Sequence, residues 1–268
     1  MLDIFQSQFM QNALLGGIII GITLAIFGVF VVMRNQALFA NGIAHASLAG
    51  IAIGLVLSDY PTIWAIIIAV LASILITYLK GNTSISFDAI IGAIYSFFFA
   101  IGIIVLSLST TYQPETTSYL FGSILLITKT KILIAAVVAL FTLGFVYKNF
   151  NALTYMTFDE DLAKVRGIKT VQYSYILNIL IAVIVVISVD LLGIVLITSL
   201  MVLGPLFARL FAKRFIQIFP ISIGFNLLNV ILGLTTSYYF DIPSGATIVV
   251  FGSIIYLCSF FIKSLTSD

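Results

Sequence analysis

The chain has 268 residues, of which 62% are hydrophobic and 8% are charged, and its formal net charge is +2. A soluble domain carries about 25% charged residues, so this chain has too few polar side chains to cover a surface in water. The single cysteine, Cys258, excludes an intramolecular disulfide and a cysteine-based metal cluster within one chain.

Apolar segments follow one another along almost the whole chain. A helix needs about 20 apolar residues to cross the hydrocarbon core of a bilayer. The first segment lacks the basic residues of a cleaved signal, so we expect it to be retained. Nine segments approach the required length and predict an all-α transmembrane bundle, namely residues 13–33, 37–57, 62–79, 89–108, 132–147, 173–189, 191–208, 216–239 and 246–262.

Two features leave the number of spans open. If the short segments that meet at Asp190 form one broken unit, the number of spans falls to eight. The segment from Tyr119 to Thr128 is too short to cross and predicts a re-entrant or interfacial half-helix, buried in protein or lining a cavity.

The basic residues predict an outside N-terminus and a cytoplasmic C-terminus. In this orientation only Lys129 and Lys131, of the 12 Lys and Arg residues, lie outside, which leaves ten on the cytoplasmic side. The acidic residues Asp3, Asp59, Glu115, Asp190 and Asp241 fall at or near the outer ends.

The second apolar segment contains polar groups where lipid-like residues are expected. Asn41 and the only histidine, His45, are four residues apart and therefore share one helix face. An imidazole near the middle of a span is a candidate ligand for a divalent transition metal, although both side chains could instead hydrogen-bond a neighbouring helix. The adjacent stripe is small and predicts close helix packing, with Gly42, Ala46, Gly50 and Gly54.

The most polar insert, residues 149–172, is expected in the cytoplasm. Its middle, from Phe158 to Ile168, resembles a short amphipathic helix on which Phe158, Leu162 and Val165 recur at helical spacing. Acidic residues occupy its first turn and Gly167 follows its end. The segment is either a solvated connector or a docking helix for a cytoplasmic partner.

Two further acidic residues are candidates at the extracellular mouth. Asp190 is either a helix cap or a charge at the mouth, and the segment from Asp241 to Gly245 is typical of a turn before the last span. The sequence has no P-loop, no H-E-x-x-H and no G-x-S-x-G, so we expect neither nucleotide hydrolysis by this chain nor a protease site. No signal for nucleic-acid binding is present.

The motifs taken in order resemble the manganese, zinc and iron permeases of ABC importers, the ABC-3 family. The segment from Ile43 to Gly50 is similar to the family's I-S-H-A-x-L-P-G motif. The other matching segments are Met33 to Leu38, Asp88 to Gly92, Tyr119 to Ser123, Phe158 and Asp159 with Ala163, Gly167 and Ile168, Gly193 to Leu196, Leu200 to Pro205, and Asp241 to Gly245.

The resemblance implies one permease domain over residues 1–268 in the cell membrane, with no permanent cofactor. It implies a dimer of permeases, ATPase subunits that bind at the cytoplasmic side, and an extracytoplasmic metal-binding protein that delivers zinc, manganese or iron as cargo. The second span then carries the metal contacts. The family usually has an aspartate where this chain has Asn41, and a proline where it has Ala49. A self-contained secondary transporter is the alternative, although it would need an ion-coupling site near the midplane.

Overall fold

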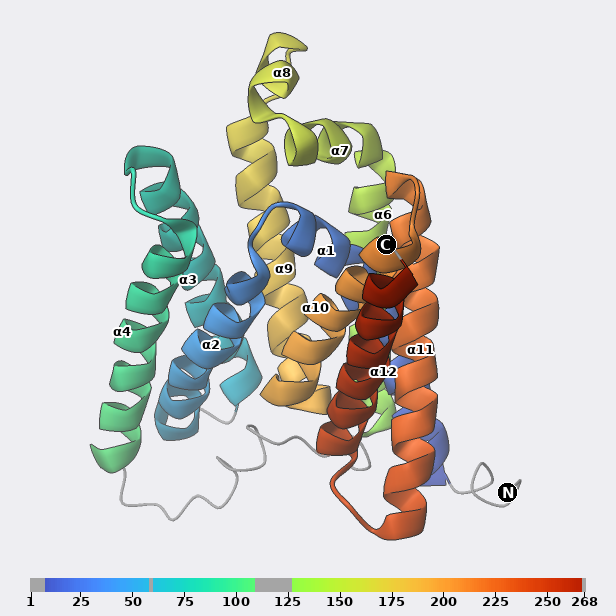
Figure 1. Cartoon of the computed structure of the whole chain (residues 1–268). Coiled ribbons are helices and arrows are strands. Elements are labelled where there is room, and N and C mark those ends of the chain that lie inside the picture. Colours follow the sequence, from blue (N-terminus) through green and yellow to red (C-terminus); the bar gives the residue numbers. More distant parts are fainter. Residues whose placement is uncertain (1–7, 58–59, 109–126, 267–268) are drawn as a thin grey trace. The chain divides into compact units, whose positions relative to one another are not determined.

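The computed structural model describes residues 8–57, 60–108 and 127–266, and these ranges are helical, without a β-strand (Figure 1). Most of the expected half-helix lies outside the described residues, as do Asp3, Asp59 and Glu115. The long helices are α1 (Gln8–Met33), α2 (Ala37–Leu57), α3 (Pro61–Asn82), α4 (Phe87–Leu108), α6 (Lys129–Lys148), α9 (Thr170–Leu192), α10 (Ile194–Phe211), α11 (Phe215–Phe240) and α12 (Ser244–Thr266). Two short helices, α7 (Phe150–Phe158) and α8 (Glu160–Val165), lie between α6 and α9.

In the described part of the chain, nine helices are long and apolar enough to cross a membrane, which confirms the predicted spans. The chain is therefore a multi-pass membrane protein. Gly193 separates α9 from α10 with a φ of 80°, a conformation that glycine adopts without steric cost. Each of the two helices is long enough to cross by itself, so they are counted as separate spans.

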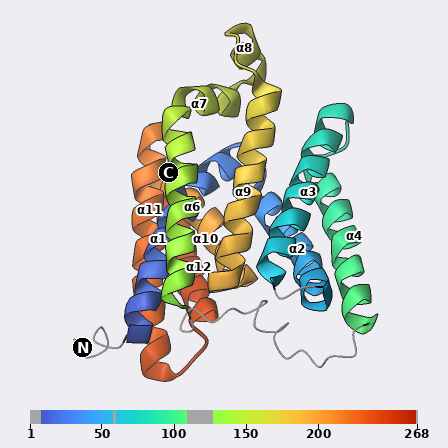
Figure 2. The ribbon, with the colours of Figure 1, turned by 180° about the vertical axis from the view of Figure 1, so that it is seen from behind.

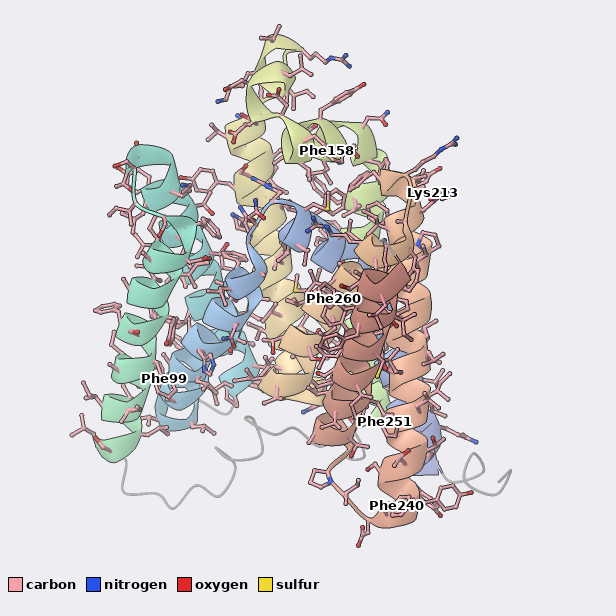
Figure 3. The ribbon with its side chains drawn as sticks, viewed as in Figure 1. Phe99, Phe158, Lys213, Phe240, Phe251 and Phe260 are labelled. Carbon is pink, nitrogen blue, oxygen red and sulfur yellow. The ribbon has the colours of Figure 1, made fainter. Side chains whose placement is uncertain are left out.

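The chain divides into two compact units. The first unit comprises residues 1–32, 115–143 and 191–268, and the second comprises residues 33–114 and 144–190. Side chains along the long helices are mostly hydrocarbon, as Figure 3 shows, and many large apolar residues remain exposed, which is what lipid rather than water tolerates.

In the first unit, α10, α11 and α12 pack against one another. A row of polar side chains on α11 lies inside this unit: Ser222, Asn226 and Asn229 are at most 1% exposed. The Asn226 amide donates to the carbonyl oxygens of Gly21 (3.1 Å) and Leu200 (2.9 Å), and so joins three helices. The spacing of four and three residues along α11 is the sequence signal for this row, since it places all three on one face.

In the second unit, α2 packs against both α3 and α4, and the three helices lie side by side in Figures 1 and 2. Residues 170–190 of α9 belong to the same unit, and the Asn178 amide donates to the Thr77 hydroxyl of α3 at 2.9 Å. This unit carries the histidine of α2 and the polar insert.

Candidate functional site

One face of α2 keeps the polar residues of the second span partly exposed. Asn41, His45 and Leu48 follow one another at helical spacing and are all half-buried, whereas the residues that flank them are buried. Among the described residues, none donates or accepts a side-chain hydrogen bond with Asn41 or His45. Both side chains therefore keep their coordinating atoms free within this part of the chain.

The imidazole of His45 lies against two aromatic rings of α4. Its centroid is 5.7 Å from that of Tyr95 and 5.9 Å from that of Phe99, which it meets edge to face. The sequence pattern did not indicate these neighbours, although their spacing of four residues places them on one face of α4. Figure 3 shows Phe99 on the side of α4 that faces α2.

A single chain offers few ligands at this point. No group of three or more His, Cys, Asp or Glu side chains that could hold a metal occurs among the described residues. Structural zinc sites close a tetrahedron with four protein ligands, so one imidazole and one amide oxygen would leave most of the coordination shell to water or to another chain. Such an open shell suits transient contact with an ion rather than permanent storage.

The small residues of α2 bring its neighbours very close. A Cβ added at Gly50 would lie 2.5 Å from the Cα of Ala65, and one added at Gly54 would lie 2.5 Å from the Cα of Pro61, both on α3. Gly42 meets the side chain of Ile91 on α4, and Ala46 is 1% exposed. Because a larger side chain could not fit here without a backbone shift, the stripe fixes α2 between α3 and α4.

The polar insert forms two helices rather than the single amphipathic helix expected from Phe158 to Ile168. Asp159 has extended backbone angles (φ −152°) and ends α7, so Phe158 lies on a different helix from Leu162 and Val165. The Asp159 carboxylate accepts the backbone N–H of Leu162 at 2.8 Å and thereby caps α8. The sequence did not reveal this break, because the helical spacing of the apolar residues continues across it and an N-cap aspartate also fits that spacing.

The end of α8 is closed by a Schellman motif. The N–H of Ile168 donates to Ala163 O and that of Gly167 donates to Lys164 O, with Gly167 at a φ of 78°. Ala163 is fully buried. The large apolar side chains at the corner between α7 and α8 point outward instead, with Phe158 59%, Leu162 47% and Val165 85% exposed.

The surface of α8 is charged. Lys164 lies 3.1 Å from Asp161 and 3.9 Å from Glu160, and the hydrogen bond to Asp161, together with the charge of Glu160, raises the pKa of Lys164. Exposed pairs of this kind add little stability. Exposed apolar side chains beside charges that remain in water form a surface on which another protein can pack.

The two other acidic candidates lie at helix ends. Asp190 is near the end of α9, two residues before its last residue, and is half-buried. Asp241 ends α11 in the left-handed conformation (φ 51°) and is exposed, and its N–H donates to the carbonyl oxygen of Ser237. Their role at an extracellular mouth stays a prediction.

Comparisons with known proteins agree on the kind of molecule. The model of the ABC 3 transport family matches residues 6–263. The manganese import system permease protein ScaB of Streptococcus gordonii is 34% identical over 255 residues, which are 95% of this chain and 91% of that protein. The high-affinity zinc uptake system membrane protein ZnuB of Haemophilus influenzae is 29% identical and covers 93% of this chain and 95% of its own length.

A solved structure shares the fold. PsaBC from Streptococcus pneumoniae, determined in complex with Fab, superposes with a TM-score of 0.86 at 33% identity, covering 97% of this chain and 94% of that one. The family match spans nearly all of the sequence, and the shared fold extends over 97% of this chain. The chain belongs to the ABC 3 transport family.

Proposed function

We propose that this chain is the membrane-spanning permease subunit of an ABC importer that moves a divalent transition metal into the cytoplasm, with manganese or zinc as the cargo. The observation that carries the proposal is the likeness, over nearly the whole chain, to permeases named for manganese and for zinc import. The chain has no P-loop, so ATP hydrolysis is assigned to a separate subunit.

Asn41 and His45 are the residues that would meet the ion. An imidazole nitrogen and an amide oxygen suit a borderline metal such as zinc, while manganese favours carboxylate, carbonyl and water oxygens. In a symmetric dimer, two copies of each side chain would supply up to four ligands. The half-buried, unbonded state of both side chains in the described part of the chain supports this assignment.

The corner formed by α7 and α8 is the surface proposed for the ATPase. Its exposed apolar residues Phe158, Leu162 and Val165 would enter a groove of that subunit, and buried Ala163 with Gly167 would hold α8 in shape. An extracytoplasmic metal-binding protein would deliver the ion to the opposite side. Both partners, and a second permease copy, are part of the proposal.

Uptake into vesicles tests the function. The chain is reconstituted with its ATPase subunit and the metal-binding protein, and uptake of labelled manganese and zinc is measured with ATP and with a non-hydrolysable analogue. We expect uptake of at least one metal with ATP only. Uptake by the chain alone, driven by an ion gradient, would instead identify a secondary transporter.

A further inference from the structure

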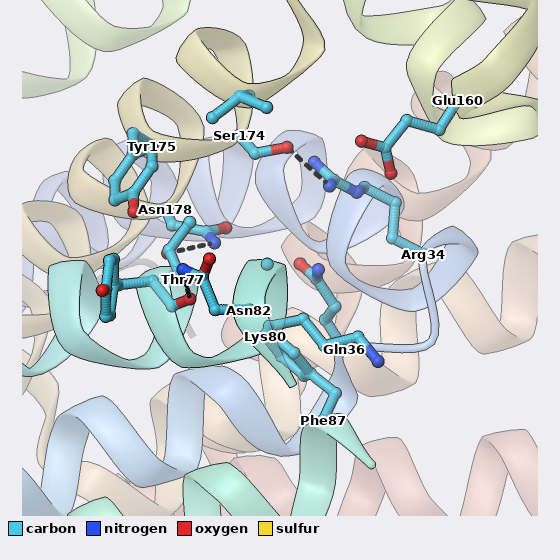
Figure 4. Close-up of a pocket in the computed structure, with 13 residues that line it drawn as sticks. Arg34, Gln36, Thr77, Lys80, Asn82, Phe87, Glu160, Ser174, Tyr175 and Asn178 are labelled. Carbon is cyan, nitrogen blue, oxygen red and sulfur yellow. Dashed lines mark hydrogen bonds between the residues drawn. The ribbon is translucent and has the colours of Figure 1, made fainter. Parts of the chain in front are cut away.

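A cavity of about 330 Å³ in the second unit is separate from the α2 face that carries His45. It opens where α3 ends and α9 begins, and residues of the turn between α1 and α2 line it (Figure 4). Asn35 in this turn has a φ of 55°, and its neighbours Arg34 and Gln36 both line the cavity. Because the ends of spans meet the membrane surface, the cavity lies at the level of lipid headgroups.

Two basic side chains supply donors to the cavity. The Nη2 of Arg34 donates to the Ser174 hydroxyl at 3.1 Å, while its Nη1 is buried and has no partner among the described residues. Lys80 contacts the Ile85 carbonyl at 3.4 Å and is otherwise exposed. Burial lowers the pKa of Arg34 from its ordinary value, and the charge of Glu160, which also lines the cavity, opposes this shift.

Two amide side chains supply acceptors. Gln36 is 8% exposed and Asn178 is 2% exposed, and the amide oxygen of each lacks a partner in the described part of the chain. The amide nitrogen of Asn178 is already used, since it donates to Thr77 at 2.9 Å. A buried polar atom without a partner costs about 1–3 kcal/mol, so these oxygens call for a donor that enters the cavity.

Exposed apolar side chains continue from the cavity along α3. Leu71, Leu75 and Tyr78 recur at helical spacing and are 51%, 37% and 55% exposed. On α9, Val171 and Ile176 are 61% and 40% exposed. Hydrocarbon chains could therefore lie along the same helices that present the polar cavity.

We propose that the cavity binds the headgroup of an anionic, hydroxyl-bearing phospholipid, with its phosphate on Arg34 and Lys80 and its hydroxyls on Gln36 and Asn178. Arg34 and Lys80 are positive and Glu160 is negative, which leaves one net positive charge to match a phosphodiester. Basic pockets between helices at the cytoplasmic side of a membrane are a known mode of headgroup recognition. A soluble phosphate ester with hydroxyls has the same chemistry and is distinguished in the test.

Native mass spectrometry of the purified full-length chain, with any subunit that copurifies, measures the binding. Phosphatidylglycerol, phosphatidylethanol and phosphatidylcholine are added separately after delipidation, where phosphatidylethanol is a phosphodiester of the same charge as phosphatidylglycerol but has no headgroup hydroxyls. We expect phosphatidylglycerol to bind about tenfold more tightly than phosphatidylcholine. Arg34→Gln should remove most of this preference, and Lys80→Gln, which changes an exposed side chain and leaves folding intact, should weaken it about fivefold. Lys148→Gln, an exposed basic residue outside the cavity, is the matched control and should bind as the unchanged chain does.

The remaining outcomes distinguish a lipid headgroup from a soluble phosphate ester and test the amide side chains separately from the basic ones. One such outcome is that glycerol 3-phosphate competes, that its binding depends on Lys80, and that the chain shows no preference among the lipids. This outcome would assign the site to a soluble ester and overturn the lipid proposal. Phosphatidylethanol that binds as well as phosphatidylglycerol would overturn the role of Gln36 and Asn178. Equal binding of all three lipids, unchanged in Lys80→Gln and without competition, would overturn the site altogether.

Discussion

The phenyl ring of Phe99 meets the imidazole of His45 edge to face, with ring centroids 5.9 Å apart and planes at 86°. Aromatic pairs of this geometry contribute about 0.5–1.5 kcal/mol beyond the area they bury. Because Phe99 belongs to α4, the direction in which the histidine of α2 presents its nitrogen atoms depends on a second helix.

Replacing the histidine tests the proposed metal contact. We expect His45→Ala to abolish uptake of labelled zinc and manganese into vesicles that contain equal amounts of assembled transporter. Leu48→Ala is the matched control, because Leu48 shares the half-buried face but cannot coordinate. Full uptake by His45→Ala would make the histidine a packing residue. Asn41→Asp should preserve uptake or shift it toward manganese, since a carboxylate is the harder ligand.

Acid should weaken the same site. Only neutral imidazole coordinates a metal, so metal binding by the assembled transporter is expected to fall as the pH falls through the titration of His45. The measurement is equilibrium binding of zinc at several pH values. The same titration on His45→Ala is the control, and an identical pH profile in that variant would contradict the assignment.

Phe99 is expected to act as a positioning residue. Phe99→Leu removes the edge-to-face contact but keeps an apolar side chain, and should weaken metal binding about two- to tenfold while assembly is unchanged. Phe97→Leu is the control, because Phe97 is 58% exposed and packs against Phe98 instead. Equal affinity in the two variants would show that the ring has no influence on the histidine.

The close approach of α2 and α3 predicts that one methyl group added at Gly50 lowers the stability of the protein. Gly50→Ala would place a Cβ 2.5 Å from the Cα of Ala65, so we expect a loss of about 1–3 kcal/mol in stability. Gly92→Ala adds the same group where nothing lies within 4 Å, and should be neutral or mildly stabilising. Thermal unfolding in detergent compares the two, and similar midpoints would contradict the packing.

The exposed corner between α7 and α8 predicts that a substitution there impairs the coupling of ATP hydrolysis to transport and leaves folding intact. Leu162→Asp places a charge on an exposed position of α8, so the permease should still fold and assemble. We expect ATP hydrolysis to lose its stimulation by transport. Ile85→Asp is the control, because Ile85 lies in another connection and is 53% exposed, against 47% for Leu162. Unchanged transport in Leu162→Asp would leave this insert as a solvated connector.

The orientation in the membrane is predicted by the basic residues. A reporter fused after Lys263 should report the cytoplasm, and one inserted at Glu115 should report the outside. The same result at both positions would contradict the assignment of spans.

The spans could be predicted from the sequence because the bilayer imposes their length and composition. The break at Asp159 could not, since the choice between a cap and a helix-interior position depends on the backbone and not on the spacing of apolar residues. Contacts between segments that are far apart in the sequence could not be predicted either. Arg34 and Ser174 are 140 positions apart, and Thr77 and Asn178 are 101 apart, so neither pair leaves a local pattern.

The corner of the polar insert is braced at both ends. The guanidinium of Arg166, just after α8, lies 4.3 Å from the centroid of the Tyr155 ring on α7, and the Tyr173 hydroxyl of α9 donates to Asn149 at the start of α7 at 3.1 Å. These two contacts oppose bending between α7 and α8 and between α7 and α9. A protein that displaced α8 would therefore also displace α7 and the start of α9.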